Sequence, residues 1–370
     1  MPLPSSRSVK SFPESHAAAA LAAGDASFDP FALPYPALEA RVVAQGGARL
    51  HALRWFRALH RTGDADPGRV PELGRRLTAR LQALARPRLP ALDDLQTSAD
   101  GAVKLRARLG DGQRVESVLI PDGARLTLCV SSQAGCAVGC RFCATGTLGL
   151  ARNLTAGEIV GQAILARIHA ARPVTNVVFM GMGEPLQNWP AVRDAVELLN
   201  SPNAYNLSRH KITISTSGVL PRLEAVVREA RTGLALSLHA TEDSERTALI
   251  PLNRVYPLAA LMAELRRLAL HHGARIMIQY LLLAGRNDTP EHARRLWAWI
   301  RDWPCHVNVL EYNGVPGLPF ERSDPAVTQH FKAELLALGA RVYHRQSRGR
   351  DILGACGQLA NGGETASCRA

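Results

Sequence analysis

The part of the chain after residue 125 alternates between runs of consecutive apolar residues and amphipathic stretches. The apolar runs are LTLCV (126–130), TNVVFMG (175–181), KITIST (211–216), GLALSL (233–238), RIMIQYLLL (275–283) and HVNVLEY (306–312). Between the first two, AGEIVGQAILARIHAA (156–171) follows Thr155 and carries Glu158, the pattern of a helix capping box. Strands that are apolar along their whole length and alternate with helices predict a parallel sheet. Six such units favour an α/β barrel or partial barrel over a doubly wound sheet.

The N-terminal part of the chain has a different pattern. Residues 1–36 are rich in Ala, Pro and Ser and show little periodicity, so we expect a flexible lead-in. In residues 37–94, apolar positions recur at helical spacing and arginines share other helix faces, which predicts a small basic helical accessory domain. These arginines form either a solvated helix face or a surface that grips RNA.

A hairpin signal separates this helical part from the alternating part. The segment AVKLRARLGDGQRVESVLI (102–120) consists of two extended runs around Asp111-Gly112. We therefore expect a linking β-hairpin over residues 95–125, the barrel over 126–360 and a disordered tail over 361–370.

Composition adds a charge bias to this picture. The 370-residue chain has a formal net charge of +12, and its cations are almost all arginine, because lysine occurs only at positions 10, 104, 211 and 332. Guanidinium groups contact phosphate in a bidentate manner and stack on bases, so the excess is compatible with RNA binding, although a GC-rich genome alone would produce it too. The chain has neither an apolar run of membrane-spanning length nor the apolar core of a signal peptide, which predicts a soluble, cytoplasmic protein.

Polar residues gather directly after four of the predicted strands. They occur in GMGEP (181–185), STSG (215–218), SLHA (237–240) and EYNG (311–314). The loops at the carboxyl ends of parallel strands form the active-site face of such folds, and the cysteine-rich segment after the first strand falls on the same face.

Four of the seven cysteines lie in CVSSQAGCAVGCRFCATG (129–146), and three of them, Cys136, Cys140 and Cys143, have the spacing C-x3-C-x2-C. A structural zinc site normally has four protein ligands, and the sequence has no second C-x2-C or H-x3–5-H pair. A redox dithiol would leave Cys136 unused. A [4Fe–4S] cluster can be held by three thiolates of a short loop, which leaves one iron for a small molecule. The spacing favours a cluster, and a zinc-stabilised RNA-binding module without catalysis is the alternative.

The cysteine motif, with Phe142 directly before its third cysteine, resembles that of the radical S-adenosylmethionine (SAM) superfamily. Further segments, in this order, resemble the RlmN/Cfr family of RNA methyltransferases: CVSSQAGCAVGCRFCATGTLGLARNLTAGEIVGQ, FMGMGEPLQN, ISTSGVLP, LALSLHA, IPLNRVYP and RGRDILGACGQL. The likeness runs from about residue 95 to residue 360. It implies a radical-SAM partial (βα)6 barrel, with the N-terminal helices as accessory domain.

The resemblance also implies cofactors and the residues that hold them. Cys136, Cys140 and Cys143 would hold one [4Fe–4S] cluster, and SAM would bind its open iron. The positions that match the family's SAM site are Gly183, Glu184, Ser215, Ser237, Leu238, His239 and Asn313. Glu184 would accept hydrogen bonds from the SAM ammonium group, and Leu238 would contact SAM through its backbone.

The resemblance implies a radical route, because an adenine ring carbon is a poor nucleophile. One SAM would methylate Cys356, and a 5′-deoxyadenosyl radical from a second SAM would take a hydrogen atom from that methyl group. The methylene radical would add to the adenine carbon and a base would remove the ring proton. Cys129 would then attack the Cys356 sulfur and release the product as a disulfide forms. Glu116 aligns with the proton acceptor, and its alternation with Val118 and Ile120 predicts a partly apolar environment.

The substrate implied by the resemblance is C2 of an adenosine in 23S ribosomal RNA, with transfer RNA as a further substrate. A Cfr-like enzyme that methylates C8 is the alternative, because it would use the same cluster and the same two cysteines. A radical-SAM activase or mutase is disfavoured by Cys129 and Cys356. An electron donor such as flavodoxin or ferredoxin would be required, no membrane is expected, and the chain is expected to act as a monomer.

Overall fold

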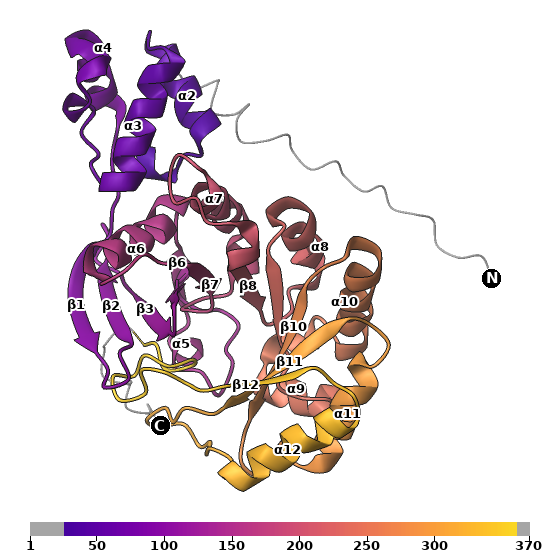
Figure 1. Ribbon diagram of the computed structural model, residues 1–370. Helices are drawn as coiled ribbons and strands as arrows, with labels where there is room; N and C mark the ends of the chain where they lie inside the picture. The colour runs from indigo at the N-terminus through magenta and orange to yellow at the C-terminus, as the bar shows by residue number, and fades with distance from the viewer. Residues whose placement is uncertain (1–25, 361–370) are drawn as a thin grey trace.

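One large sheet organises the computed structural model, which describes residues 26–360 (Figure 1). In spatial order its ten strands are β1 (Ala91–Thr97), β2 (Val103–Arg108), β3 (Arg114–Asp122), β4 (Arg125–Cys129), β7 (Asn176–Phe179), β8 (Ile212–Thr216), β9 (Gly233–Ser237), β10 (Ile276–Leu282), β11 (Cys305–Glu311) and β12 (Val342–Arg345). The strands from β1 to β4 pair antiparallel, and those from β4 to β12 pair parallel. Within the described residues β12 and β1 do not pair, so the parallel part is a partial barrel.

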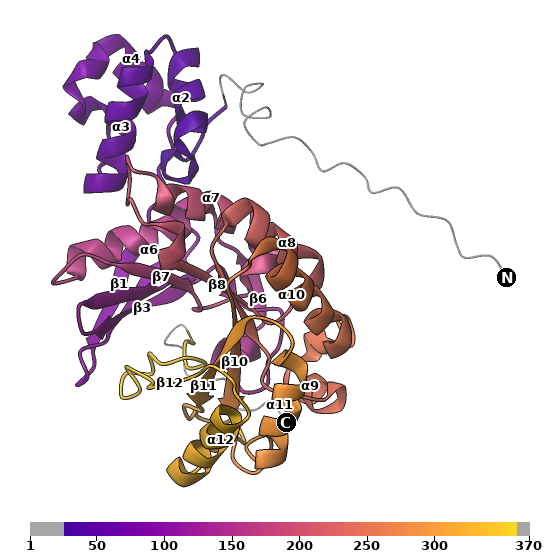
Figure 2. The same cartoon turned by 45° about the vertical axis from the view of Figure 1, so that its right-hand side comes forward.

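Helices cover the convex side of the parallel strands, as the two views in Figures 1 and 2 show. They are α6 (Ala156–His169), α7 (Trp189–Asn200), α8 (Leu223–Ala225), α9 (Asp243–Leu249), α10 (Leu258–His272), α11 (Pro290–Ile300) and α12 (Pro325–Ala337). The capping box predicted for α6 is present, because Thr155 Oγ1 accepts from Glu158 N–H at 3.1 Å and Glu158 Oε2 accepts from Thr155 N–H at 2.9 Å. No helix in residues 26–360 is long and apolar enough to cross a bilayer.

The six barrel strands predicted from apolar runs are all present, each within two residues of its predicted bounds. The predicted hairpin is formed by β2 and β3, with Asp111-Gly112 in the turn. Two strands of this large sheet were not predicted, β1 and β12. β1 occupies residues 91–97, so the expected limit of the helical domain at residue 94 is wrong. Both strands have alternating exposed and half-buried side chains and lack an apolar run.

The accessory domain contains α2 (Tyr35–Ala44), α3 (Arg49–Thr62) and α4 (Gly74–Leu84). The lead-in expected over residues 1–36 is wrong for residues 26–36, because Phe28 and Phe31 are buried in this domain; residues 1–25 and the tail expected over 361–370 lie outside the described residues. The domain packs against the loop between α7 and β8, where the Arg57 guanidinium donates to Asn203 Oδ1 at 2.9 Å.

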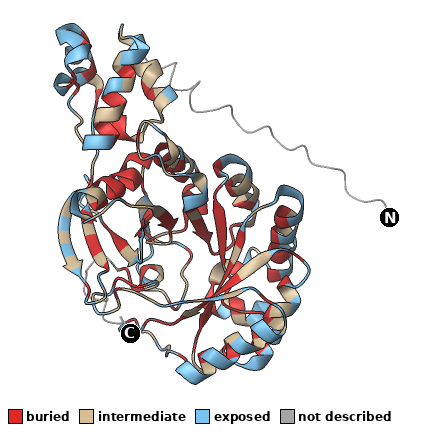
Figure 3. Cartoon of the chain, in the orientation of Figure 1, coloured by how far each residue is buried: buried red, intermediate tan, exposed pale blue. Residues whose placement is uncertain are grey.

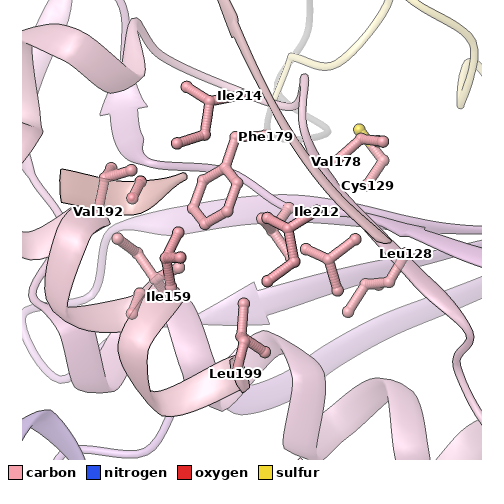
Figure 4. Close-up of a cluster of buried hydrophobic side chains, with 14 of the residues drawn as sticks. Leu128, Cys129, Ile159, Val178, Phe179, Val192, Leu199, Ile212 and Ile214 are labelled. Carbon is pink, nitrogen blue, oxygen red and sulfur yellow. The ribbon is translucent and has the colours of Figure 1, made fainter. Parts of the chain in front are cut away.

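The apolar interior is continuous between the accessory helices and the sheet (Figure 3). Figure 4 shows the part beneath α6 and α7, where Leu128 and Phe179 pack with Ile159 and Leu199. Cys129 follows Leu128 on β4, so its side chain points to the opposite, concave face of the sheet. A second cluster surrounds the cysteine loop and consists of Val138, Phe142, Ala144, Ala240, Leu249, Ile250, Leu281, Leu283, Tyr312 and Val315.

After β12 the chain crosses the carboxyl ends of the strands as an irregular segment, residues 346–360, which we call the C-terminal strap. Hydrogen bonds fix it at both ends. Ser98 Oγ donates to Asp351 Oδ1 at 2.6 Å, and near the other end Thr145 Oγ1 donates to the Leu359 carbonyl at 2.6 Å. The strap therefore lies between the β1–β2 turn and the cysteine loop, and it carries Cys356.

Candidate active site

Cys136, Cys140 and Cys143 lie on one loop between β5 (Gln133–Gly135) and α5 (Ala144–Thr147). The loop is pinned to β6 (Leu150–Asn153), which pairs with β5. Gly135 makes this close approach because a Cβ there would lie 2.0 Å from the Gly149 carbonyl oxygen, and its φ is +80°. The Cys136 N–H donates to the same carbonyl at 2.7 Å, which fixes the start of the loop.

The three cysteines line one open cavity with an empty volume of about 960 Å³, its mouth included. Burial raises the pKa of the Cys136 thiol to about 12 and also raises the pKa of Cys140 and of Cys143. Bound iron would counter this effect, because a metal cation favours the thiolate. Within the described residues no three His, Cys, Asp or Glu side chains are arranged to hold one metal ion. Separate thiolates that reach into one cavity fit a cluster, in which each binds a different iron, better than they fit a mononuclear zinc ion.

Glu184 lies beside this loop, after β7, and is 3% exposed. Its Oε2 accepts from the Ser217 N–H and from Ser217 Oγ, both at 2.7 Å, and its Oε1 accepts from Leu186 N–H at 3.0 Å. Burial raises the pKa of Glu184, and these hydrogen bonds oppose that rise. Gly183 is required next to it, because its φ is +97° and a Cβ would lie 2.5 Å from Gln133 Cβ. The carboxylate is therefore held on the cavity wall by its neighbours.

Ser215 and Ser237 stand on the cavity wall at the carboxyl ends of β8 and β9. Both hydroxyls donate to Gln279 Oε1, at 3.1 Å and 3.3 Å. Gln279 on β10 was not among the predicted site residues, although it is the one polar side chain in the apolar run RIMIQYLLL apart from its terminal Arg and the Tyr hydroxyl. This amide organises the two serines.

His239 is 5% exposed and lines the same cavity with its ring against Phe142, at 5.1 Å between centroids. Its Nδ1 accepts from the Leu281 N–H at 3.1 Å, and burial lowers its pKa to about 3, so the ring is neutral. Leu238, in contrast, does not line the cavity. Its N–H donates to the Gln279 carbonyl at 3.0 Å and its carbonyl accepts from Arg246 at 3.1 Å, so the expected backbone contact with SAM lacks a free donor.

Arg246 was also missed, because no strand-end motif contains it. The guanidinium is 1% exposed and donates to four oxygens: Ser217 O at 2.6 Å, Ser237 O at 3.1 Å, Leu238 O at 3.1 Å and Asn253 Oδ1 at 2.8 Å. Burial lowers its pKa to about 10, which leaves it charged at neutral pH. One cation thus ties the loops after β8 and β9 together behind the cavity.

A second cavity, of about 740 Å³, adjoins the first. Cys129 lines only this second cavity, whereas Cys356 lines both. The other residues common to the two walls are Met180, Gln279, Leu281 and Leu310. Burial raises the pKa of Cys129 to about 12, nearby Cys356 raises it further, and the Met180 N–H and Arg345 oppose the rise. Cys356 itself is exposed. It lies on the strap between the three-cysteine loop and Cys129.

Asn313 lines the second cavity and not the first. Its Nδ2 donates to the Cys356 carbonyl at 3.1 Å, so it holds the strap, and its Oδ1 is buried without a partner among the described residues. Asn313 was expected beside the other SAM residues, but it does not line their cavity. Its link to that cavity is the hydrogen bond to Cys356.

Glu116 is 1% exposed, which its alternation with Val118 and Ile120 predicts. Its environment is not simply apolar, however. Oε1 lies 3.7 Å from Lys104 Nζ, and Oε2 accepts from the strap's Ala360 N–H at 3.0 Å. Glu116 lines neither cavity, so the structure gives it an anchoring contact with the strap.

Comparison with known proteins decides the family. The Radical SAM superfamily model matches residues 130–296. A curated "Dual-specificity RNA methyltransferase RlmN" of Anaeromyxobacter dehalogenans is 42% identical over 336 residues, which cover 89% of this chain and 90% of the relative, and the protein of the same name in Marinobacter nauticus is 41% identical over 88% and 91%. The chain belongs to the RlmN/Cfr family.

The fold agrees with this membership. A crystal structure of a radical SAM methyltransferase from Sphaerobacter thermophilus, 39% identical, superposes with a TM-score of 0.85 and covers 90% of this chain and 99% of that one. As a radical SAM enzyme, this RlmN/Cfr member uses a [4Fe–4S] cluster and SAM, and the three cysteines of the first cavity are the residues suited to hold the cluster.

Proposed function

We propose that the protein methylates C2 of an adenine in 23S ribosomal RNA, and in transfer RNA as well, through a methylated Cys356. The observation that carries the proposal is the position of Cys356, which lines both the cavity with the three-cysteine loop and the cavity with Cys129. A carrier of a methyl group must meet its donor in one place and its acceptor in another, and this side chain reaches both.

SAM and the cluster, bound in the first cavity, would supply the methyl group and the 5′-deoxyadenosyl radical that removes a hydrogen atom from it. The chain's own part is to bind and orient. Glu184 would accept hydrogen bonds from the SAM ammonium group, and the hydroxyls of Ser215 and Ser237, oriented by Gln279, would contact its polar groups. Two SAM molecules would be consumed for each methyl group transferred.

Cys129 would release the product. When its sulfur attacks the Cys356 sulfur, an S–S bond forms and the bond from Cys356 to the transferred carbon breaks, and the carbon then takes up a proton. A dithiol reductant must reduce the disulfide before the next turnover. Because burial raises the pKa of Cys129 to about 12, the step needs a base, or the approach of Arg345, to generate the thiolate.

Glu116 remains the proposed proton acceptor, although its carboxylate is engaged by the strap. The role requires that the contact with the Ala360 N–H opens when RNA enters. Glu116→Gln keeps an acceptor for that N–H and removes the base, so we expect Cys356 to be methylated normally while RNA methylation stops.

The proposed RNA substrate is supported by cations and by relatives. Arg345 and Arg348 line the second cavity, where guanidinium groups can hold backbone phosphates. The relatives named above are called dual-specificity RNA methyltransferases, which supports action on both ribosomal and transfer RNA. The C2 position follows the RlmN branch, and C8 would be the Cfr-like outcome.

The decisive experiment compares three cysteine variants after anaerobic reconstitution with iron, sulfide, SAM, flavodoxin and RNA. Cys356→Ala should give neither methylated protein nor methylated RNA. Cys129→Ala should accumulate a covalent protein–RNA adduct, because its release step is missing. Cys305→Ala, which removes a thiol that lines neither cavity, should behave as the wild type.

Mass spectrometry of nucleosides from the same reactions identifies the carbon: 2-methyladenosine supports the proposal, and 8-methyladenosine moves the enzyme to the Cfr-like branch. An active Cys356→Ala variant would contradict the methyl-carrier role. The zinc-module alternative predicts a colourless protein that holds zinc, whereas a brown protein with iron and labile sulfide rejects it.

A further inference from the structure

An open cavity of about 900 Å³ lies at the end of the barrel opposite the cysteine loop. It is formed where β8, β9 and β10 begin, whereas the candidate active site lies where these strands end. Its lining residues are His210, Val227, Arg228, Arg231, Thr232, His272, Gly273, Ala274 and Arg275. Three of the nine are arginines, two are histidines and none is acidic, so the cavity is suited to an anion.

Only part of this positive charge is neutralised by neighbouring side chains. Arg228 pairs with Glu224 at 3.1 Å, but the same carboxylate is shared with Arg267 at 2.9 Å. Among the described residues, the Arg275 side chain makes one hydrogen bond, which it donates to the His210 carbonyl at 3.4 Å. The Arg231 side chain is exposed and has no ion-pair partner in the described part of the chain. The guanidinium groups of Arg231 and Arg275 are thus available to a ligand.

A buried hydroxyl at the cavity provides an independent sign of a ligand. Thr232 is 5% exposed, lines the cavity, and its Oγ1 has no hydrogen-bond partner among the described residues. A buried hydroxyl left without a partner is unfavourable, because it has lost its hydrogen bonds to water. Rotation of the Thr232 side chain would present this hydroxyl to an acceptor oxygen held by the arginines.

The cavity lies on the side of the barrel where the accessory domain is attached. The loop between α7 and β8 contains His210 near its end, and earlier residues of this loop hold the accessory domain: Asn203 accepts from Arg57 at 2.9 Å and the Pro202 carbonyl accepts from Arg61 at 3.2 Å. Figure 2 shows α7, α8 and α10 in succession along the outer surface, with the accessory domain at the α7 end. A long polyanion could therefore contact the accessory domain and this cavity together.

We propose that this cavity is a secondary RNA site, which binds a backbone phosphate of the RNA substrate through Arg231, Arg275 and the Thr232 hydroxyl. The inference rests on the RNA substrate of the proposed function. The site would strengthen binding of a large folded RNA that extends beyond the active site, without a part in methyl transfer. A short stem-loop that fills only the active site would not reach it.

The test compares Arg231→Gln/Arg275→Gln with the matched control Arg266→Gln/Arg301→Gln, which removes two exposed arginines outside the cavity. Dissociation constants for full-length transfer RNA are measured at several salt concentrations. Loss of one phosphate contact reduces the slope of log K against log salt by about 1, and we expect five- to ten-fold weaker binding at low salt. The control should keep the wild-type slope, and methylation of a short stem-loop should be equal in all three proteins.

Thr232→Val provides a second test that changes no charge. Valine has nearly the shape of threonine, so the protein should be as stable as the wild type or more stable, while its affinity for transfer RNA should fall two- to five-fold. The proposal is overturned if the cavity double variant binds transfer RNA like the control, or if stem-loop methylation falls equally. Failure of the wild type to bind any RNA would instead reject the proposed function.

Discussion

Replacement of Arg246 by methionine should destabilise the protein strongly, although Arg246 is in none of the recognisable motifs. Methionine fills similar space but donates no hydrogen bond. The carbonyls of Ser217, Ser237 and Leu238 and the Asn253 side-chain oxygen would lose their donor in a site that is 1% exposed. Each buried acceptor without a partner costs about 1–3 kcal/mol. Since the variant no longer buries a charge, we expect a net loss of about 3–5 kcal/mol in the free energy of unfolding.

Urea denaturation followed by circular dichroism measures this loss. Arg266→Met is the control, because Arg266 is an exposed residue of α10. The control should stay within about 0.5 kcal/mol of the wild type. Arg246→Lys should fall between the two, because an ammonium group keeps the charge but cannot reach all four oxygens.

Arg246→Met should also bind SAM at least ten-fold more weakly, as measured by calorimetry of the reconstituted protein. Ser217 holds the Glu184 carboxylate and receives Arg246 on its carbonyl, so movement of this loop displaces the acceptor for the SAM ammonium group. A loss of stability below about 1 kcal/mol together with unchanged SAM affinity would refute the reasoning, since four buried acceptors would then have found other partners.

Further predictions concern backbone, titration and redox state. Gly183→Ala should lower SAM affinity at least ten-fold in calorimetry, since its Cβ would lie 2.5 Å from Gln133, whereas Gly314→Ala, with open space, should not. Burial lowers the pKa of His60 to about 3, so the folded state keeps the ring neutral and loses stability as pH falls below the unfolded value of 6.5. Between pH 8 and pH 5 this amounts to about 2 kcal/mol in urea titrations, and His60→Leu should remove that part; an unchanged pH dependence would contradict it. Oxidised, product-released enzyme should show a Cys129–Cys356 disulfide in peptide mapping, absent from Cys129→Ser.

The parallel sheet and the cysteine loop could be predicted because their signals are local. Each buried strand is a continuous apolar run. Polar residues that come directly after parallel strands lie on the same face of the barrel, at the carboxyl ends of the strands. β1 and β12 were not predicted because exposed and half-buried side chains alternate along them, so neither strand contains an apolar run. Gln279 and Arg246 were not predicted as site residues for another reason. Their hydrogen-bond partners, such as Ser215 and Ser217, are distant from them in sequence.

The two cysteines of the second cavity differ in how the chain supports them. Cys129 is fixed in β4 between two neighbouring strands, whereas Cys356 sits on the irregular C-terminal strap. A disulfide requires the two Cα atoms to lie about 5.5 Å apart, so oxidation would tether the strap to the sheet. Because Cys356 also lines the first cavity, that tether would change the cavity's mouth. Reduction would then restore both thiols and release the strap from the sheet before the next turnover.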